Sequence, residues 1–323
     1  MNTTEPPLQA DTQLPAGRPP ETPPSPKPSP ADGELSVSIP LNALASDESY
    51  VLFDEHGRVL CAEQKGSWGW AYLGDFDTYN SDVLHIAASP SGPGSPPALN
   101  VSAKDQSWSL YANGPIGGDP WLFASGQRWP GYPRLTLSPI AGGGTSHQFT
   151  LEIEIDGERK ALKAGSNTWD WLYVANPGKE PTRFTLHRYH VSGNGLFDLI
   201  NATWPSLPAG ALFEVDAAYQ AISSHHARQI WQDSGLGRCR WRSESFDCDD
   251  FAFVYKGQAS LDAYHNNATH PYAVGWIAGL SGTDAHAVNL FLDLDGHLKI
   301  LEPQTGEITL AQDWSYAPYQ VMV

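Results

Sequence analysis

The sequence predicts an α+β protein with two folded parts, an all-β N-terminal domain and a C-terminal domain that mixes helix and strand. At 323 residues the chain is long enough for two compact cores. Its 30 Gly and 27 Pro against two Met favour turns and short strands over long helices. We expect a leader over residues 1–35, a β-rich repeat domain over 36–192 and the C-terminal domain over 205–323.

The leader is rich in proline, as in the run PPETPPSPKPSP, and this composition is typical of a disordered or extended segment. It has no apolar stretch of the kind found in secretory signals. No segment of the chain reaches the ~20 apolar residues that a transmembrane helix needs. Three cysteines do not suggest a disulfide framework. We therefore expect a cytoplasmic protein or one exported without a leader.

The formal net charge of −17 argues against nucleic acid or an anionic membrane as the partner. Clustered carboxylates suit a hard cation instead.

The N-terminal domain contains three similar units with a period of about 50 residues. Each unit opens on an extended run, passes an aromatic station and closes on another extended run. The openings are Val51-Leu52-Phe53, Leu99-Asn100-Val101 and Leu151-Glu152-Ile153; the stations are Trp68-Gly69-Trp70, Trp121-Leu122-Phe123 and Trp169-Asp170-Trp171; the closing runs are Leu84-His85-Ile86, Leu135-Thr136-Leu137 and Phe184-Thr185-Leu186. Three units of four short strands predict a β-trefoil, with a β-sandwich as the alternative.

Tryptophan rings in such a domain suggest carbohydrate binding, because aromatic faces stack on sugar rings. We expect Trp68, Trp121 and Trp169 to fill equivalent core positions instead. The candidates for exposed, sugar-binding rings are Trp70, Trp129 and Trp171.

At the start of the C-terminal domain, residues 215–234 have apolar residues at helical spacing and predict an amphipathic helix. His225 and His226 are adjacent on it and point about 100° apart, so we expect them to be solvated and not to share a metal.

A second helix is predicted to begin at Cys248, with Asp247 as its N-cap, Lys256 in its last turn and Gly257 as its end. The unpaired backbone N–H groups and the dipole of a helix N-terminus favour a thiolate. Cys248 is therefore a candidate nucleophile.

Three carboxylates, from Asp247, Asp249 and Asp250, frame this cysteine. Like-charge repulsion should disfavour the thiolate. Either the carboxylates point away from it, or a cation neutralises them, and oxygen ligands of this type suit Ca²⁺.

Residues 286–304 predict a β-hairpin whose loop is Leu294-Asp295-Gly296, with Gly296 at positive φ. In that register His286 lies opposite Gln304 and Val288 opposite Glu302, so His286 and Glu302 share a face. A two-residue loop, Asp295-Gly296, would put Glu302 on the other face.

Cys248, His286 and Glu302 thus supply a nucleophile, a base and a group that orients the base, as nucleophilic acyl transfer requires. The helix N-terminus offers a backbone N–H to the oxyanion. Gln304 and Trp276 are candidates for the second oxyanion donor.

The runs Phe-Asp-Cys-Asp-Asp-Phe-Ala at 246–252, His286-Ala287-Val288-Asn289 and Glu302-Pro303-Gln304 are together similar to the C-terminal domain of the Marasmius oreades agglutinin family. Asp216, Tyr219 and Trp231 also resemble that family. Its members join a β-trefoil lectin to a papain-like, calcium-dependent cysteine protease.

The resemblance implies catalysis by Cys248, His286 and Glu302, with a nearby Ca²⁺ site that includes Asp250, Gln304 and Asp216. It also implies a homodimer, a protein or peptide substrate, a glycan ligand and a role as a defence toxin. The N-terminal domain departs from the family, since only Gln106-Ser107-Trp108 matches the Gln-x-Trp signature of its trefoil. Two alternatives remain: a cysteine amidase or transglutaminase-like acyl transferase, and a lectin or interaction protein whose C-terminal domain only dimerises.

Overall fold

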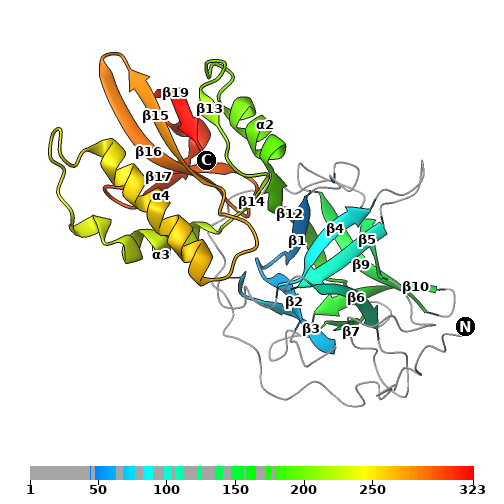
Figure 1. Cartoon of the computed structure of the whole chain (residues 1–323). Helices are drawn as coiled ribbons and strands as arrows, with labels where there is room; N and C mark the ends of the chain where they lie inside the picture. The colour runs from blue at the N-terminus through cyan, green and yellow to red at the C-terminus, as the bar shows by residue number, and fades with distance from the viewer. Residues whose placement is uncertain are drawn as a thin grey trace, which may run out of the picture.

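The computed structural model describes residues 44, 48–62, 68–76, 83–89, 98–103, 106–112, 122–125, 135–140, 147–155, 158–164, 172–175 and 179–323. The leader expected over residues 1–35 lies outside them. The described residues form a large N-terminal antiparallel sheet, followed by helices and a smaller mixed sheet (Figure 1). This arrangement confirms the α+β class.

The N-terminal sheet is built from short strands and curls until it nearly closes. Its strands are β1 (Ser49–Asp54), β2 (Val59–Ala62), β3 (Trp68–Gly74), β4 (His85–Ser89), β5 (Ala98–Ala103), β6 (Gln106–Ala112), β7 (Leu122–Ser125), β8 (Leu135–Pro139), β9 (Gln148–Ile155), β10 (Glu158–Ala164), β11 (Leu172–Val174) and β12 (Arg183–Ser192). β1 pairs with β12 on one side and touches β4 on the other, so the first and last strands meet.

The predicted repeat is visible in the strand pairing. In each group of four strands the first pairs with the second, as in β1–β2, β5–β6 and β9–β10. The second and third form hairpins, β2–β3, β6–β7 and β10–β11. The predicted opening runs lie in β1, β5 and β9, and the closing runs overlap β4, β8 and β12.

The expectation that Trp70 is exposed is wrong. Its side chain is only 4% exposed and belongs to an apolar core with Val51, Cys61 and Tyr72. Because Trp70 alternates inward along β3, its ring face is covered by protein and is not open to a sugar. Trp129 and Trp171 lie outside the described residues.

The C-terminal part packs helices on a six-stranded sheet of order β13-β19-β15-β16-β17-β18. Its elements are α2 (Gly193–Thr203), β13 (Leu212–Phe213), β14 (Ala218–Gln220), α3 (Ser224–Ser234), η3 (Leu236–Arg238), α4 (Cys248–His265), β15 (Val274–Ser281), β16 (Asp284–Leu292), β17 (Leu298–Glu302), β18 (Glu307–Leu310), η4 (Ala311–Asp313) and β19 (Ala317–Met322). Helix α4 packs on β15 and β16, with α3 beside it (Figure 1). None of the helices that the structure describes is long and apolar enough to cross a membrane.

The helix predicted over 215–234 begins only at Ser224, where the Ser223 side chain accepts a hydrogen bond from His226 N at 2.9 Å. The preceding residues form β14, which pairs with β12 of the N-terminal sheet. A tertiary strand pairing thus overrides the helical spacing in this segment. His225 is exposed as expected, but His226 is not solvated, since it pairs with Asp262 at 2.8 Å.

Helix α4 starts at Cys248 as predicted, because Asp247 and Asp250 form a reciprocal capping box around its first turn. It does not end at Gly257 but continues to His265. Gly257 faces open space without a positive φ, so it costs only about 1 kcal/mol of helix propensity. Ala259 and Ala263, buried beyond it, keep the helix on the sheet.

One apolar core joins the two parts of the molecule. It contains Val51 and Tyr72 from the N-terminal sheet together with Ile277 and Leu290 from the C-terminal sheet. Tyr219 of β14 is fully buried within it. Its hydroxyl accepts hydrogen bonds from Val215 N and Asp216 N, each at 3.0 Å, and donates to Val323 O at 3.4 Å.

Replacing Tyr219 by Phe should therefore lower the free energy of unfolding by about 0.5–1.5 kcal/mol, because the hydrogen bonds of its buried hydroxyl are lost. Denaturant unfolding of the whole chain measures this change. Tyr264→Phe is the matched control, since Tyr264 is 77% exposed and should leave stability unchanged. Equal stability of both variants would show that the Tyr219 hydroxyl does not anchor this segment.

Candidate active site

The hairpin that carries His286 and Glu302 has the predicted register. Leu290 lies opposite Ile300 and Leu292 opposite Leu298. The loop is closed by hydrogen bonds from Asp293 N to His297 O and from Gly296 N to Asp293 O, both 2.9 Å, and Gly296 has φ 87°. The loop therefore contains three residues, as expected, and the shorter alternative is excluded.

This register brings His286 and Glu302 into contact. Nε2 of His286 lies 2.6 Å from Oε2 of Glu302, and Oε1 of Glu302 accepts a hydrogen bond from Gln304 N at 3.1 Å. A carboxylate only accepts, so Nε2 carries the proton and Nδ1 is the nitrogen left to act as a base.

Cys248 lies beside the same strand. It is the first residue of α4 and packs, half-buried, against a small apolar cluster that includes Ala287 and Ala278. Ala287 follows His286 in β16, and a hydrogen bond from its backbone to the Cys248 sulfur favours the thiolate. The helix start and the strand thus place the thiol next to the residue that follows the base.

The surroundings of Cys248 nevertheless hold its pKa above the ordinary value. Burial is the largest cause, and the negative charges of Asp247 and Asp249 add to it. Hydrogen bonds from the backbone of Ala287 and of Asp249 lower the Cys248 pKa, but the net shift is upward. The favourable position at a helix N-terminus is therefore outweighed by desolvation and two like charges.

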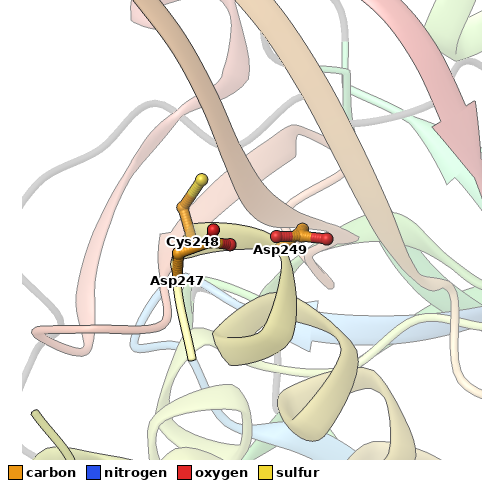
Figure 2. Close-up of side chains that lie close together, drawn as sticks. All are labelled: Asp247, Cys248 and Asp249. Atoms are coloured by element: carbon orange, nitrogen blue, oxygen red, sulfur yellow. The ribbon is translucent and has the colours of Figure 1, made fainter. Parts of the chain in front are cut away.

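The two carboxylates do not point away from each other. Asp247, Cys248 and Asp249 each place one ligand atom within 4.8 Å of the other two (Figure 2). The pKa of Asp249 is raised, first by a hydrogen bond with Asp247, then by burial and by the charge of Asp247. Two neighbouring carboxyl groups are an oxygen-rich arrangement of the kind that a hard cation takes.

The other predicted metal ligands lie differently. Asp250 uses Oδ2 to accept the backbone N–H of Asp247 at 3.1 Å, as part of the capping box. Asp216 lies near Lys256, whose pKa is lowered by burial and partly restored by the Asp216 charge. Gln304 is half-buried next to Glu302, and its backbone N–H binds that carboxylate.

Trp276, a candidate oxyanion donor, lies in the cluster against which Cys248 packs, and its ring stacks on Phe253 with centroids 5.4 Å apart. Its Nε1 is buried and has no hydrogen-bond partner. Because that atom is closed to solvent, an incoming carbonyl cannot reach the indole N–H without movement of the surrounding side chains.

An aromatic pair that the sequence did not predict covers His286. The Tyr316 ring lies 5.4 Å from the imidazole, and its hydroxyl donates to Asp284 Oδ2 at 2.8 Å. The ring of Trp314 also packs on Tyr316, with the centroids 5.4 Å apart. Gly279, opposite His286 in the sheet, makes room for both, since a Cβ there would lie 2.7 Å from Trp314. In the sequence, the sign of this close approach is Gly279 itself, a glycine inside a run of apolar residues that is typical of a strand.

A comparison with protein-family models agrees with the family resemblance that the sequence motifs suggested. Residues 219–308 match the family model "Agglutinin C-terminal", and this range includes Cys248, His286 and Glu302. No curated protein matches the chain.

Two solved structures share the fold at 20% sequence identity, and each alignment covers 87% of this chain and all of the other. One is a Polyporus squamosus lectin bound to the human-type influenza-binding epitope Neu5Aca2-6Galb1-4GlcNAc, with a TM-score of 0.54. The other is described as "PSL1a-E64 complex", with a TM-score of 0.53. The resemblance of the C-terminal part of this chain to the agglutinin family, expected from its motifs, is therefore confirmed.

Proposed function

We propose that the C-terminal part is a cysteine peptidase that uses Cys248, His286 and Glu302. The observation that carries this proposal is the 2.6 Å contact between His286 and Glu302 next to a cysteine that begins a helix. The same three residue types were expected from the sequence, and all three fall within the agglutinin C-terminal match.

In the proposed reaction His286 Nδ1 accepts the thiol proton of Cys248, and the thiolate attacks the carbonyl carbon of a peptide bond. Glu302 holds the imidazole in the tautomer with the proton on Nε2 and stabilises the imidazolium that forms. Backbone N–H groups in the first turn of α4 face the developing oxyanion. The imidazolium then protonates the leaving amine, and water hydrolyses the acyl-enzyme.

We further propose that Asp247 and Asp249 hold a Ca²⁺ ion. Their oxygens suit this cation, whereas the soft thiol sulfur does not. When bound, the cation neutralises the charges that raise the Cys248 pKa.

For the N-terminal part we propose a β-trefoil that binds glycans. The support is the threefold recurrence of strand pairing and the fold shared with a lectin bound to a sialylated glycan. A glycan-binding part joined to a peptidase suits a defence toxin.

The two alternatives remain distinguishable. An amidase or transglutaminase-like acyl transferase would use the same triad on another substrate. A domain that only dimerises would leave Cys248 inert, which makes reaction with the thiol-directed inhibitor E-64 informative, given the complex formed by the structural relative.

The central prediction is that hydrolysis of a generic protein substrate requires both Ca²⁺ and Cys248. Cys248→Ala should lower the rate by at least about 10³-fold, because the nucleophile is lost. Excess chelator should have a similar effect on the wild type, and added Ca²⁺ should restore activity.

Cys239→Ala is the matched control, since Cys239 is a free and exposed thiol that is not one of the three proposed catalytic residues. It should keep wild-type activity. Mass spectrometry after E-64 treatment should find the adduct on Cys248 and not on Cys239. Activity that survives in Cys248→Ala would eliminate the proposed nucleophile, and an E-64 adduct without peptide hydrolysis would favour the acyl-transferase alternative.

A second prediction concerns the orientation of the base. Glu302→Gln should lower kcat by about 10²-fold, because the neutral amide no longer stabilises the imidazolium. Tyr316→Phe keeps the ring on His286 and removes only the bond to Asp284, so a smaller loss is expected. Steady-state kinetics with circular dichroism as a folding check measures both. Full activity of Glu302→Gln would contradict the role of Glu302.

A third prediction is that the full chain binds sialylated N-acetyllactosamine on a glycan array or by calorimetry, independently of Ca²⁺ chelation and of Cys248→Ala. Since Trp70 is buried, Trp70→Phe should change stability more than glycan affinity. An array without any bound glycan would refute the lectin role of this part.

A further inference from the structure

Three histidines form a row where the N-terminal sheet meets the C-terminal part. His85 lies on β4 and His190 on β12, whereas His270 lies between α4 and β15. The ring centroids of His85 and His190 are 5.5 Å apart, and those of His190 and His270 are 4.6 Å apart. The peptidase reaction proposed above uses none of these residues.

Polar but uncharged groups surround the middle of the row. The Tyr189 ring lies 4.1 Å from His85 and 4.5 Å from His190. Nδ1 of His190 is hydrogen-bonded to the Ser49 hydroxyl on β1 at 2.9 Å, and the Gln220 side chain on β14 is a further partner. The Nε2 atoms of His85 and His190 are buried without a hydrogen-bond partner.

The described surroundings offer His85 and His190 no carboxylate. Burial lowers the pKa of His85 to about 4. The pKa of His190 is lowered to about 3, by burial first and then by the charges of His85 and His270, while Gln220 acts in the opposite direction. Both rings are therefore neutral at neutral pH.

Asp262, on the neighbouring helix α4, already has hydrogen-bond partners outside the row. Tyr272, which faces Tyr189, donates its hydroxyl to Asp262 of α4 at 3.1 Å. The same carboxylate oxygen pairs with His226 of α3 at 2.8 Å. Asp262 therefore serves other partners and does not balance a charge in the row.

A further histidine, His187, is buried and marks a second contact across the same boundary. His187 of β12 is 3% exposed, and burial lowers its pKa to about 4, partly offset by the charge of Asp295 and a hydrogen bond with the Leu294 backbone. Both of these residues belong to the β16–β17 loop, where Lys299 pairs with Asp295 at 2.6 Å. Thr185 accompanies His187 on its own strand, with the hydroxyl 2.8 Å from Nε2.

We propose that the row of His85, His190 and His270 makes the contact between the two parts of the molecule acid-sensitive, so that protonation of the row releases the C-terminal part from the N-terminal sheet. Protonation of His85 and His190 places two cations side by side, with their Nε2 atoms buried and without a hydrogen-bond partner, so that they repel each other and must be hydrated. Separation of the two parts exposes the protonated imidazoles to water. It also exposes the apolar core that joins the two parts, which opposes the separation.

The direction follows from linkage. In the joined state the pKa values of His85 and His190 lie below the ordinary 6.5, and in the separated state they return toward it. Protons therefore bind the separated state preferentially. The contact is at full strength above pH 6.5 and weakens as the pH falls from 6.5 toward about 4. For one histidine with this shift the separation constant rises by about 80-fold over that interval.

Small-angle X-ray scattering of the full chain from about pH 7.5 to 4 tests the proposal, with far-UV circular dichroism to show that both parts stay folded. The radius of gyration should rise between about pH 6.5 and 4 before secondary structure is lost. In the double variant His85→Gln/His190→Gln the rise should move at least about one pH unit lower. His225→Gln changes an exposed histidine on α3 and should behave as wild type.

A wild-type radius that stays constant down to about pH 4, or a double variant that opens at the wild-type pH, would overturn the proposal. If the double variant does not fold, NMR of the wild-type imidazoles replaces it. His190 should take up its proton together with the increase in radius, and a titration near pH 6.5 in a chain that stays compact would also overturn the proposal. These outcomes do not depend on peptidase activity.

Discussion

The three-residue loop at 294–296 sets the register of β16 against β17, and this register decides whether Glu302 shares a face with His286. Gly296, at φ 87°, adopts the left-handed conformation that the loop requires. One residue fewer would turn Glu302 toward the opposite face, and the 2.6 Å contact with His286 would be lost. The apolar residues of the same face, including Leu290 and Leu298, then hold the hairpin in the core.

Around Cys248 the position at a helix start favours the thiolate, whereas burial and the neighbouring carboxylates disfavour it. The capping box of Asp247 and Asp250 starts α4 and thereby places the thiol at a helix N-terminus. Burial first, and then the charges of Asp247 and Asp249, hold the pKa of Cys248 above its usual value. Asp247 thus stabilises the helix start and also disfavours the thiolate, and a cation bound by Asp247 and Asp249 would satisfy both requirements.

The parts of the structure that depend on local signals were predictable from the sequence. The start of α4, the loop of the β16–β17 hairpin and the repeated strands follow from capping, turn chemistry and alternation. Tertiary contacts decided the rest. Ala218–Gln220 form a strand because they pair with β12. Helix α4 continues past Gly257 because its later alanines are buried against the sheet. Trp70 is buried in the core of the curled sheet. The contact between Tyr316 and His286 could not be predicted, because no local sequence pattern connects the two segments.

We propose that the charges of Asp247 and Asp249 disfavour the Cys248 thiolate until a bound cation neutralises them. The most direct measurement is the rate of alkylation of Cys248 by iodoacetamide at neutral pH, with and without Ca²⁺, followed by peptide mass spectrometry. Cys239, exposed and free, serves as the reference thiol within the same molecule. Ca²⁺ should accelerate alkylation at Cys248 and leave the rate at Cys239 unchanged. Equal rates at Cys248 with and without Ca²⁺ would contradict it.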